Sequence, residues 1–400
     1  MADRRGTPGP PDPDLLRGAL ARAIATVRAN LAAWSIEYPD DCTRGGLYAA
    51  RPARPALGLP AGANWGWTTG FVPGMQWLAW QATGEAPLAA AARAHVARFA
   101  ERLLARTDLD THDLGFLYTL SCVVPHDLLG DEAAGETARA AADHLLGRVL
   151  PSAGIVQAWG DLDDPAQRGR TIIDSLMNMP LLYWAGAVAG EARYGAAAMR
   201  HTEQLRDRII RPDGTTYHTF AWDPVTGEPL RGQTAQGYSD ASCWARGQAW
   251  GIYGFALGAR HTGDDSFRRA AARLADVFWD RLPADRVPYW DLAFADGADQ
   301  PRDSSAGAVA AAGLLELAAL CEDRAEVAGQ VYAARADAIL TALASRYVPA
   351  DPAVPGSPLL LHGVYNLPGG EGVDEGTLWG DYFYLEALCR RVGPAWRSYW

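Results

Sequence analysis

The 400-residue sequence contains no lysine, so its basic side chains are 36 arginines and eight histidines. Against 47 aspartates and glutamates, this leaves a formal net charge of −11 and an isoelectric point near 5.2. Proteins that bind nucleic acid through its phosphates carry clustered lysines and arginines and are usually basic. We therefore expect no nucleic-acid partner.

Long apolar runs are missing too. No run comes near the roughly 18 residues needed to span a bilayer, so we expect no membrane partner. The first segment, MADRRGTPGPPDP (1–13), has early arginines but lacks the apolar stretch of about 7–15 residues that a signal peptide needs. It is expected to be a disordered lead-in to a single domain, residues 14–400, which is long enough to bury a large core.

Cysteine is scarce and scattered. The five cysteines form no C-x-x-C pair, which suits reduced buried thiols better than disulfides or a zinc site and favours a cytoplasmic protein. The eight histidines never occur at H-x-x-x-H spacing, and DLDDPAQRGR (161–170) lacks the glycine and terminal glutamate of a calcium loop.

Two further kinds of motif are absent. No phosphate-binding glycine loop follows a strand, and no serine lies in a G-x-S-x-G context. The sequence therefore predicts no metal site and no cofactor, which leaves acid/base chemistry as the interpretation. It leaves the oligomeric state open.

Two kinds of helix alternate along the chain. One kind has the hydrophobic period of a surface helix: within 87–106, Leu88, Ala92 and Val96 share a face and the arginines lie elsewhere. The other kind is apolar all round and rich in Gly, Ala and aromatic residues, as buried helices are. The predicted surface helices are 14–36, 87–106, 133–150, 192–210, 265–282 and 323–346. The predicted buried helices are 71–83, 114–125, 179–189, 246–261, 306–321 and 380–392.

Each predicted buried helix follows a loop dense in Trp, Gly, Asp or Arg. The six loops recur about every sixty residues, which accommodates two helices and two connections of ordinary length. Six alternating pairs predict an all-α fold in which helical hairpins close a ring, an (α/α)6 barrel with the buried helices inside and the loops at one end. A non-closing superhelical stack of hairpins is the alternative, although such repeats usually keep a more uniform period.

Two aspartates occupy matching positions in these loops. Asp113 lies in the run HDLGFLY and Asp174 in IIDSLMNMPLLYW, each directly before a long apolar stretch. Either one alone would be interpreted as a helix cap. Proline is tolerated in the first turn of a helix, so Pro180 predicts a helix that begins beside it and leaves Asp174 in a loop or irregular first turn. A longer, kinked helix is the alternative.

Tryptophan is abundant, with 15 residues, and many lie in the predicted loops. A single tryptophan would be interpreted as core, but clustering beside acids and polar groups is typical of surfaces on which sugars stack. His218, Gln236 and Arg246 share the same set of loops, and paired carboxylates with an arginine are a common acid/base and anion-binding combination. The loop tryptophans are Trp65, Trp67, Trp159, Trp222, Trp244, Trp250, Trp290 and Trp379.

Seven runs occur in order along the chain, from about Trp34 to Leu388, and together they resemble one family, the unsaturated glucuronyl hydrolases of glycoside hydrolase family 88. The runs are WTTGFVPGMQWLA, HDLGFLY, IIDSLMNMPLLYWA, DGTTYHTFAWDPVTGEPLRGQTAQGYSDASCWARGQAWGIYGFALGARHTGD, LPADRVPYWDL, RDSSAGAVAAAGLLEL and GVDEGTLWGDYFYLEAL. The resemblance implies an (α/α)6 barrel, in agreement with the helix count.

The resemblance also implies an unusual hydrolysis. Members of this family act on oligosaccharides whose terminal uronic acid carries a carbon 4 to carbon 5 double bond. A proton goes to carbon 4, water adds to carbon 5, and the hemiketal collapses to a 4-deoxy-5-keto uronic acid and the shortened sugar. One positioned acid and a held water can do most of this work, because protonation of an enol ether gives an oxocarbenium ion that the ring oxygen stabilises.

By motif, the resemblance assigns Asp174 as the general acid that protonates carbon 4 and the base that activates water. It assigns Asp113 as the second essential carboxylate. To donate a proton near neutral pH, Asp174 needs a pKa above about 3.9, which burial or a nearby like charge would provide. The implied substrate-binding residues are His112, His218, Gln236 and Arg246, with Arg246 or Gln236 near the uronate carboxylate, and Trp67, Trp159, Trp244 and Trp250 as stacking surfaces.

Three alternatives stay open. An inverting hydrolase of saturated glycans on the same barrel would need its carboxylates roughly 6.5–9.5 Å apart. A sibling family, the unsaturated rhamnogalacturonyl hydrolases, shares the fold and chemistry, but its motifs match less well. A glycan-binding toroid without activity would use the tryptophans to bind sugar and the aspartates only as helix caps. The preferred sugar beside the uronate depends on outer loops such as 285–303 and 351–376. Within the latter, the run PGSPLLLHGVYNLPGGEGVDEG (355–376) forms either a wall of the entrance or a mere surface loop.

Overall fold

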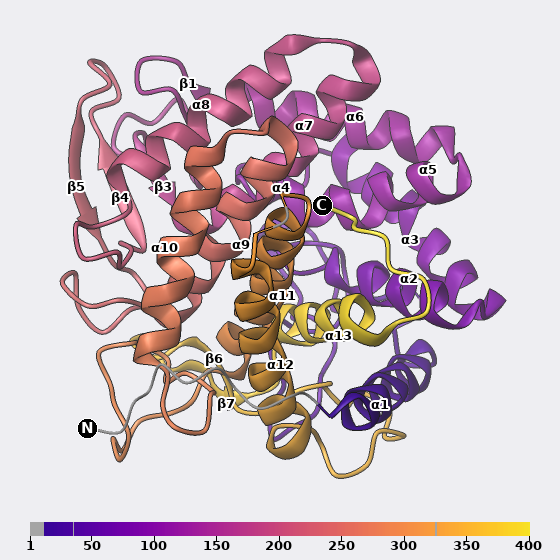
Figure 1. Cartoon of the computed structure of the whole chain (residues 1–400). Coiled ribbons are helices and arrows are strands. Elements are labelled where there is room, and N and C mark those ends of the chain that lie inside the picture. The colour runs from indigo at the N-terminus through magenta and orange to yellow at the C-terminus, as the bar shows by residue number, and fades with distance from the viewer. Residues whose placement is uncertain (1–11, 35, 325) are drawn as a thin grey trace.

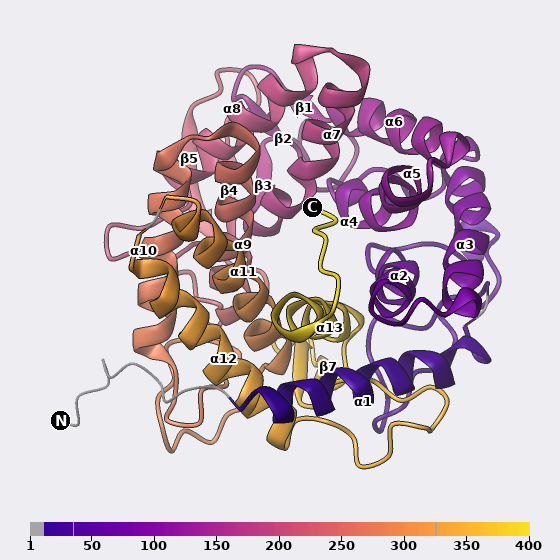
Figure 2. The ribbon, with the colours of Figure 1, turned by 45° about the vertical axis from the view of Figure 1, so that its right-hand side comes forward.

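Outer and inner helices alternate around a closed ring (Figures 1 and 2). This computed structural model describes residues 12–34, 36–324 and 326–400. The outer helices are α1 (Pro13–Leu31), α3 (Ala86–Leu104), α6 (Glu132–Gly147), α8 (Ala192–Arg208), α10 (Asp265–Arg281) and α12 (Ala328–Arg346). The inner helices are α2 (Phe71–Thr83), α4 (Leu114–Tyr118) with its continuation α5 (Val124–Leu129), α7 (Met179–Ala189), α9 (Ala245–Thr262), α11 (Ser304–Glu322) and α13 (Leu378–Val392). Helix α13 packs on α2, which closes the ring, confirms the (α/α)6 barrel and excludes the open stack.

The predicted helix boundaries agree with the structure to within a few residues. The largest differences are at α1, which ends at Leu31 rather than at residue 36, and at α12, which begins at Ala328 rather than at residue 323. Helix α7 begins at Met179 with Pro180 in its first turn, as predicted. Of the lead-in predicted to be disordered, residues 1–11 lie outside the described residues.

The second inner helix is made of three pieces. Between α4 and α5 lies a π-helical segment, η2 (Thr119–Val123), and Pro125 follows it in the first turn of α5. Proline has no N–H to donate and clashes with the preceding turn, so a wider turn before it lets the helix continue. The sequence analysis treated 114–125 as one regular helix and did not predict this change.

Helix α11 corrects one sequence-based expectation. By length and composition it is apolar enough to cross a membrane, although the sequence analysis found no such run; a single glutamate, Glu316, interrupts the apolar stretch. The apolar window is 89% buried inside the protein, where α11 packs against α9, α12 and α13. Glu316 is buried as well and forms ion pairs with Arg260 and Arg390. Helix α11 is therefore a core helix of the ring.

Connections from an outer helix to the next inner helix are long, whereas those from inner to outer helices are short. The long connections carry the 3-10 segments η1 (Pro55–Leu57) and η3 (Ile173–Asn178) and short strands that the sequence analysis did not predict. Strands β1 (Val149–Leu150) and β2 (Ile155–Val156) pair, β3 (Arg170–Ile172), β4 (Thr219–Trp222) and β5 (Pro229–Gln233) form an antiparallel sheet, and β6 (Gly363–Asn366) and β7 (Glu371–Glu375) form a hairpin. All long connections lie at the same end of the ring, because each one leads into the N-terminus of an inner helix.

The C-terminal tail, for which the sequence analysis made no prediction, runs into the centre of the ring (Figure 2). Trp400 is only 6% exposed, its indole stacks on Phe383 with centroids 5.9 Å apart, and its Nε1 donates to Glu386 Oε2 at 2.7 Å. The indole also meets Phe116 edge-on, and Phe116 contacts Trp250. The tail therefore fills the centre of the ring. A layer of aromatic side chains separates it from the long connections.

Candidate active site

The loops that precede the inner helices enclose a pocket of about 190 Å³. All ten residues proposed from the sequence line it, and three others, Ile172, Ala235 and Tyr365, complete its wall. The structure thus brings the whole predicted set together at the N-terminal ends of the inner helices, where the helix dipoles favour negative charge. The ten are His112, Asp113, Asp174, His218, Gln236, Arg246, Trp67, Trp159, Trp244 and Trp250.

The two aspartates meet at one histidine. His112 Nε2 lies 3.1 Å from Asp113 Oδ1 and 3.2 Å from Asp174 Oδ1, and the imidazole is almost fully buried between the two carboxyl groups. Asp113 Oδ2 also accepts a hydrogen bond from Thr111 Oγ1 at 2.6 Å. Asp113 occupies the N-cap position of α4 and Asp174 the first turn of η3, but neither helix end has a side-chain capping hydrogen bond, so neither carboxylate acts as a side-chain cap.

Interactions among the three charged groups shift the pKa values of His112, Asp113 and Asp174 in different ways. Burial opposes a charge on His112, but the Asp113 charge and the contacts to both carboxylates outweigh burial and raise the pKa of His112 to about 10. Burial would raise the pKa of Asp113, yet the His112 cation and the hydrogen bonds of Asp113 bring it below its usual value. Burial raises the pKa of Asp174, His112 offsets this in part, and repulsion from Asp113 adds to the increase. The arrangement therefore favours the charged forms of His112 and Asp113, and it favours the protonated form of Asp174 more than an exposed aspartate would.

A glycine lets the two acidic segments approach. Asp174 lies in the first turn of η3, which leads directly into α7. A Cβ on Gly115, near the start of α4, would lie 2.3 Å from the Asn178 Cα, so only glycine permits this contact without a shift of the backbone. Asn178 completes the junction, because its Oδ1 accepts from the Phe116 amide at 2.7 Å. The close packing of α4 on η3 therefore places both aspartates beside His112.

Gly115→Ala is expected to push α4 away from η3, because the added methyl group would overlap the Asn178 backbone. We expect a loss of about 1–3 kcal/mol in the free energy of unfolding, typical of overpacking, together with lower activity. Denaturant unfolding followed by tryptophan fluorescence measures the first effect. Gly18→Ala in α1, where a Cβ meets no atom within 4 Å, is the matched control; equal stability of the two variants would contradict the prediction.

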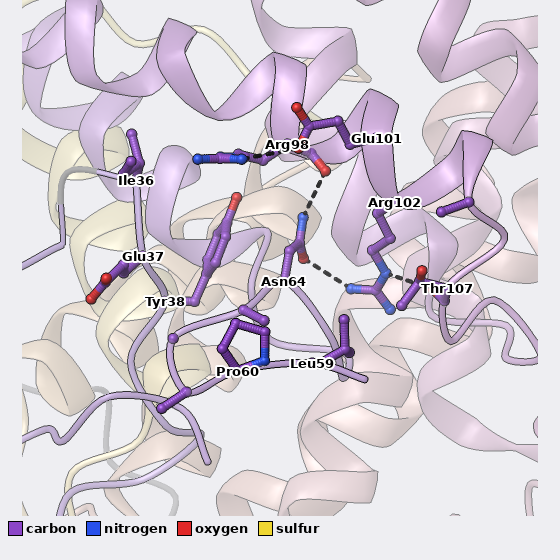
Figure 3. A pocket seen from close by; sticks show the side chains of 14 residues that line it. Ile36, Glu37, Tyr38, Leu59, Pro60, Asn64, Arg98, Glu101, Arg102 and Thr107 are labelled. Atoms are coloured by element: carbon purple, nitrogen blue, oxygen red, sulfur yellow. Dashed lines mark hydrogen bonds and ion pairs between the residues drawn. The ribbon is translucent and has the colours of Figure 1, made fainter. Parts of the chain in front are cut away.

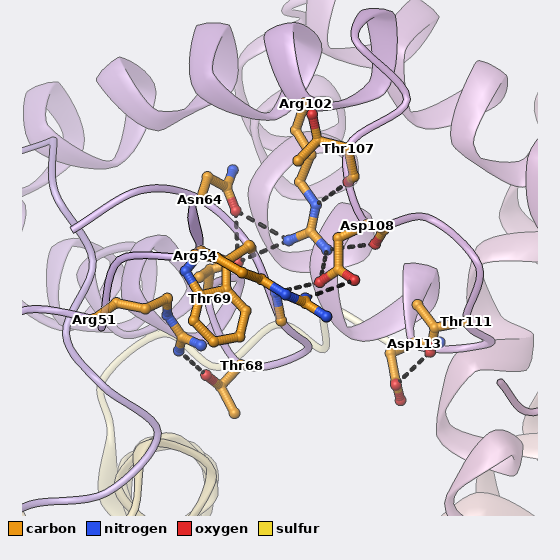
Figure 4. Close-up of polar contacts among 12 residues, drawn as sticks. Arg51, Arg54, Asn64, Thr68, Thr69, Arg102, Thr107, Asp108, Thr111 and Asp113 are labelled. Atoms are coloured by element: carbon orange, nitrogen blue, oxygen red, sulfur yellow. Dashed lines mark hydrogen bonds and ion pairs between the residues drawn. The ribbon is translucent and has the colours of Figure 1, made fainter. Parts of the chain in front are cut away.

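A buried arginine holds the loop that carries Asp113 (Figure 4). Arg102 donates to the carbonyls of Thr107 at 3.2 Å and Asp108 at 2.9 Å, and to the Asn64 side chain at 3.1 Å. Asp108 in turn accepts from the Gly66 amide at 2.7 Å. These contacts join the loop that carries Trp67 to the loop that carries Asp113, so one hydrogen-bond network supports two walls of the pocket.

A second support lies behind Asp174. Its neighbour Ser175 donates to the Ile172 carbonyl at 2.6 Å and contacts His201 Nε2 at 2.7 Å. His201 Nδ1 accepts from the Val156 amide at 2.9 Å, which makes Nε2 the protonated nitrogen of a neutral imidazole. Burial lowers the pKa of His201 to about 3 and keeps that imidazole neutral. The histidine therefore fixes η3 to β2.

Arg246 is buried, and both terminal nitrogens of its guanidinium are fully engaged. Nη1 contacts Asp303 at 3.1 Å and also donates to the Val364 carbonyl, while Nη2 donates to Gln236 Oε1 at 2.9 Å and to the Tyr365 carbonyl at 2.7 Å. Each terminal nitrogen has two N–H groups, so these four contacts use them all. Gln236, whose oxygen faces the arginine, keeps its NH₂ group free of hydrogen bonds within the described residues.

His218 faces the pocket as a neutral donor. Its Nδ1 accepts from the amides of Ala235 at 2.9 Å and Gln236 at 3.2 Å, so the proton lies on Nε2. Burial, with a smaller contribution from Arg246, lowers the pKa of His218 to about 3. The imidazole packs on Trp244 at a centroid distance of 4.3 Å, which fixes its orientation.

Comparison with known proteins decides the family. Residues 50–279 match the family described as Glycosyl Hydrolase Family 88. The chain is 41% identical over 382 residues, 96% of its length and 92% of the relative's, to the unsaturated chondroitin disaccharide hydrolase of Streptococcus pyogenes serotype M1. The chain belongs to glycoside hydrolase family 88.

Solved members of the family share the whole fold. The crystal structure of the unsaturated glucuronyl hydrolase from Streptococcus agalactiae is 39% identical and superposes with a TM-score of 0.91, covering 97% of this chain and 94% of that one. A mutant of the S. agalactiae enzyme complexed with dGlcA-GalNAc6S is 36% identical with a TM-score of 0.85, covering 100% and 97%. The barrel of this family 88 chain is therefore the barrel of these hydrolases.

The tryptophans of this family 88 chain divide into two groups. Four of the eight that the sequence analysis placed in loops line the pocket, and Trp65, Trp222, Trp290 and Trp379 do not. Within the pocket, Trp250 is 1% and Trp244 5% exposed, so both offer little surface to a ligand. Trp159 is 37% exposed, and Trp67, which is half-buried, stacks on Trp379.

Sequence reasoning missed Tyr365. It lies in β6, inside the run 355–376 that was interpreted as either a wall of the entrance or a surface loop. Tyr365 lines the pocket, so the wall interpretation is correct for this residue. Tyr365 OH accepts from Trp67 Nε1 at 3.1 Å. The only signal in the sequence was an aromatic residue in a segment rich in Gly and Pro, which by itself does not distinguish a site from a turn.

A further hollow of about 390 Å³ lies between α3 and the loop after α1 (Figure 3). Tyr38, Asn64, Arg98 and Arg102 are among its lining residues, but none of the residues around the acid pair lines it. Arg102 reaches from this hollow to the Asp113 loop, so the hollow borders the support of the active site rather than the site itself.

Proposed function

We propose that the protein is an unsaturated glucuronyl hydrolase that hydrates the carbon 4 to carbon 5 double bond of a terminal unsaturated uronic acid. The observation that carries the proposal is the coupled group of Asp113, His112 and Asp174, in which one carboxyl group has a raised pKa and the other a lowered one. A pair of titratable groups whose surroundings push their pKa values apart is the usual sign of an acid and its partner.

Asp174 carries the proton in this proposal. Its protonated carboxyl group donates to carbon 4, and positive charge develops at carbon 5 and the ring oxygen. The resulting Asp174 carboxylate accepts a proton from the water that adds to carbon 5, and the hemiketal then opens and releases the shortened sugar. Asp113 remains ionised beside the His112 cation, so its charge favours the oxocarbenium-like state without consuming the proton.

Gln236 and His218 recognise the uronate carboxylate. The free NH₂ group of Gln236 and the Nε2–H of neutral His218 are donors that line the pocket. Arg246 acts through Gln236, because its terminal N–H groups are all bound to protein oxygens. Among the tryptophans, Trp67 and Trp159 are the stacking surfaces, since Trp244 and Trp250 are nearly covered.

The same geometry argues against an inverting hydrolase. The Asp113 and Asp174 oxygens that face His112 can be no further apart than the sum of their distances to Nε2, about 6.3 Å. Inverting enzymes hold their carboxyl groups roughly 6.5–9.5 Å apart with a water between them. In this protein, one imidazole nitrogen contacts both oxygens.

An absorbance assay tests the function. The enzyme should remove the near-ultraviolet absorbance of the conjugated enol ether from lyase-generated disaccharides, and mass spectrometry should identify a 4-deoxy-5-keto uronic acid and the free second sugar. A glycan-binding toroid would bind the disaccharides in calorimetry without loss of absorbance. Release of a saturated uronic acid would instead point to an ordinary glycosidase.

The proposal also covers the extent of the catalytic domain and the cellular compartment of the protein. Residues 14–400 act as one catalytic domain, because the connections of a single closed ring of helices supply the walls of the pocket. All five cysteines are buried and unpaired, as expected of a protein that works in a reducing cytoplasm.

A further inference from the structure

Trp250, near the start of α9, lines the pocket and packs against two aromatic rings behind it. Its ring centroid lies 5.4 Å from that of Phe116 and 5.1 Å from that of Phe383. Phe116 lies in α4, directly after Asp113, Leu114 and Gly115, and its amide donates to Asn178 Oδ1 across the junction of α4 and η3. One of the two rings therefore belongs to the junction that carries both aspartates.

Trp400 contacts both of these rings from the centre of the barrel, where the C-terminal tail runs (Figure 2). Its indole stacks on Phe383, with centroids 5.9 Å apart and ring planes 13° from parallel, and meets Phe116 edge-on at 6.0 Å. Neither Phe116 nor Phe383 has any exposed surface. One side chain of the tail therefore supports both of the rings against which Trp250 packs.

Polar contacts fix the Trp400 indole in one orientation. Its Nε1 donates to Glu386 Oε2 at 2.7 Å, and the Tyr253 hydroxyl donates to the other oxygen of the same carboxyl group. Glu386 is fully buried, so the loss of either donor would leave a buried oxygen without a partner. The preceding residue, Tyr399, donates to Gln81 Oε1 at 3.1 Å and ties the tail to α2. The indole therefore cannot rotate or slide without breaking a buried hydrogen bond.

We propose that Trp400 is a positioning residue for the hydration reaction. It holds Phe116 and Phe383 in place, and through them the Trp250 wall of the pocket and the junction of α4 and η3. The inference rests on the proposed function. Protein interiors are close-packed, so the loss of a large buried side chain shifts its neighbours. A displacement of about 1 Å caused far from the reacting atoms can lower a rate by about a hundredfold.

Trp400→Ala should lower kcat by at least about tenfold at a temperature at which circular dichroism shows the variant to be folded. The two aspartates then move relative to the bound uronate, whereas KM should change less, because Gln236 and His218 lie beside β4 and β5. The pH at which kcat/KM falls should also shift, since the contacts of His112 influence the pKa of Asp174. Absorbance kinetics with one unsaturated disaccharide measure all three quantities.

Added indole separates positioning from general damage to the fold. Apolar cavities left by the removal of a large side chain bind free aromatic molecules. Indole should therefore enter the cavity of Trp400→Ala, donate its N–H to Glu386 and raise kcat back toward the wild-type value, without any effect on the wild type. Trp400→Leu, which also removes both ring contacts but leaves a smaller cavity, should show a lowered kcat as well. It keeps the test decisive if Trp400→Ala folds poorly.

A matched control removes another indole from the same tail. Within the described residues, Trp396 packs its ring against the Arg390 guanidinium at 5.2 Å rather than against Phe116 or Phe383, so Trp396→Ala should keep wild-type kcat.

Wild-type kcat in folded Trp400→Ala, or a loss that indole does not reverse, would overturn the positioning role alone. If the wild type consumed no unsaturated disaccharide, the proposed function itself would fail. A crystal structure of Trp400→Ala tests the positioning without any activity: displacement of Phe116 and η3 would support it, and their wild-type positions would refute it.

Discussion

Asp174→Asn is expected to lower kcat by at least about a hundredfold, and by up to about ten-thousandfold, while the fold is kept. The amide is nearly the size of the carboxyl group but neither donates a carboxylic proton to carbon 4 nor accepts one from water. Its neighbours in η3 stay anchored through Ser175 and His201. The loss should therefore appear in kcat rather than in KM, because the carboxyl group acts on the transition state.

Absorbance kinetics with one lyase-generated disaccharide measure this effect. For the wild type, kcat/KM should fall as pH rises through the raised pKa of Asp174, because the general acid loses its proton. Asp280→Asn, at an exposed position of α10, is the matched control and should keep wild-type kinetics. An Asp174→Asn enzyme within a few-fold of wild-type turnover would refute the assignment of Asp174.

The ring was predictable from the sequence because it follows from local patterns, whereas the full membership of its pocket also needed the resemblance to the family. Alternating hydrophobic periods mark outer and inner helices, and every long connection leads into an inner helix, so residues such as Asp113 and Arg246 had to share one end. The short strands were not predictable, because two to five residues carry too little periodicity.

The contacts that decide each residue's role join distant parts of the chain. Arg246 binds Asp303 and the backbone at Tyr365, so the sequence could not tell that Arg246 has no terminal N–H left for a substrate and that Gln236 does. The division of pKa values between Asp113 and Asp174 likewise depends on distances of about 3 Å to one nitrogen, which no spacing along the chain encodes.

His112 is the group that sets this division, and its removal should change both stability and rate. In His112→Gln, the two carboxyl groups lose the buried cation between them, which we expect to cost about 3–5 kcal/mol of unfolding free energy near pH 6.5, as for a broken buried ion pair. Without that cation, Asp113 is no longer held ionised and competes with Asp174 for a proton. Turnover should therefore fall. The pH dependence of activity should also no longer show one titration step for the acid and a separate one for its ionised partner.

The stability difference between wild type and His112→Gln should itself depend on pH. The folded-state pKa of His112 is about 10, against 6.5 for the unfolded chain, so its contribution is fully present below pH 6.5 and is lost as pH rises toward 10. Denaturant unfolding of both proteins at pH 6.5, 8 and 9.5 should show the difference shrinking. His362→Gln, which breaks an exposed pair with Asp374, should cost about 1 kcal/mol or less at every pH. A large stability difference for His112→Gln that did not change with pH would mean that the buried histidine stabilises the fold through packing and not through its charge.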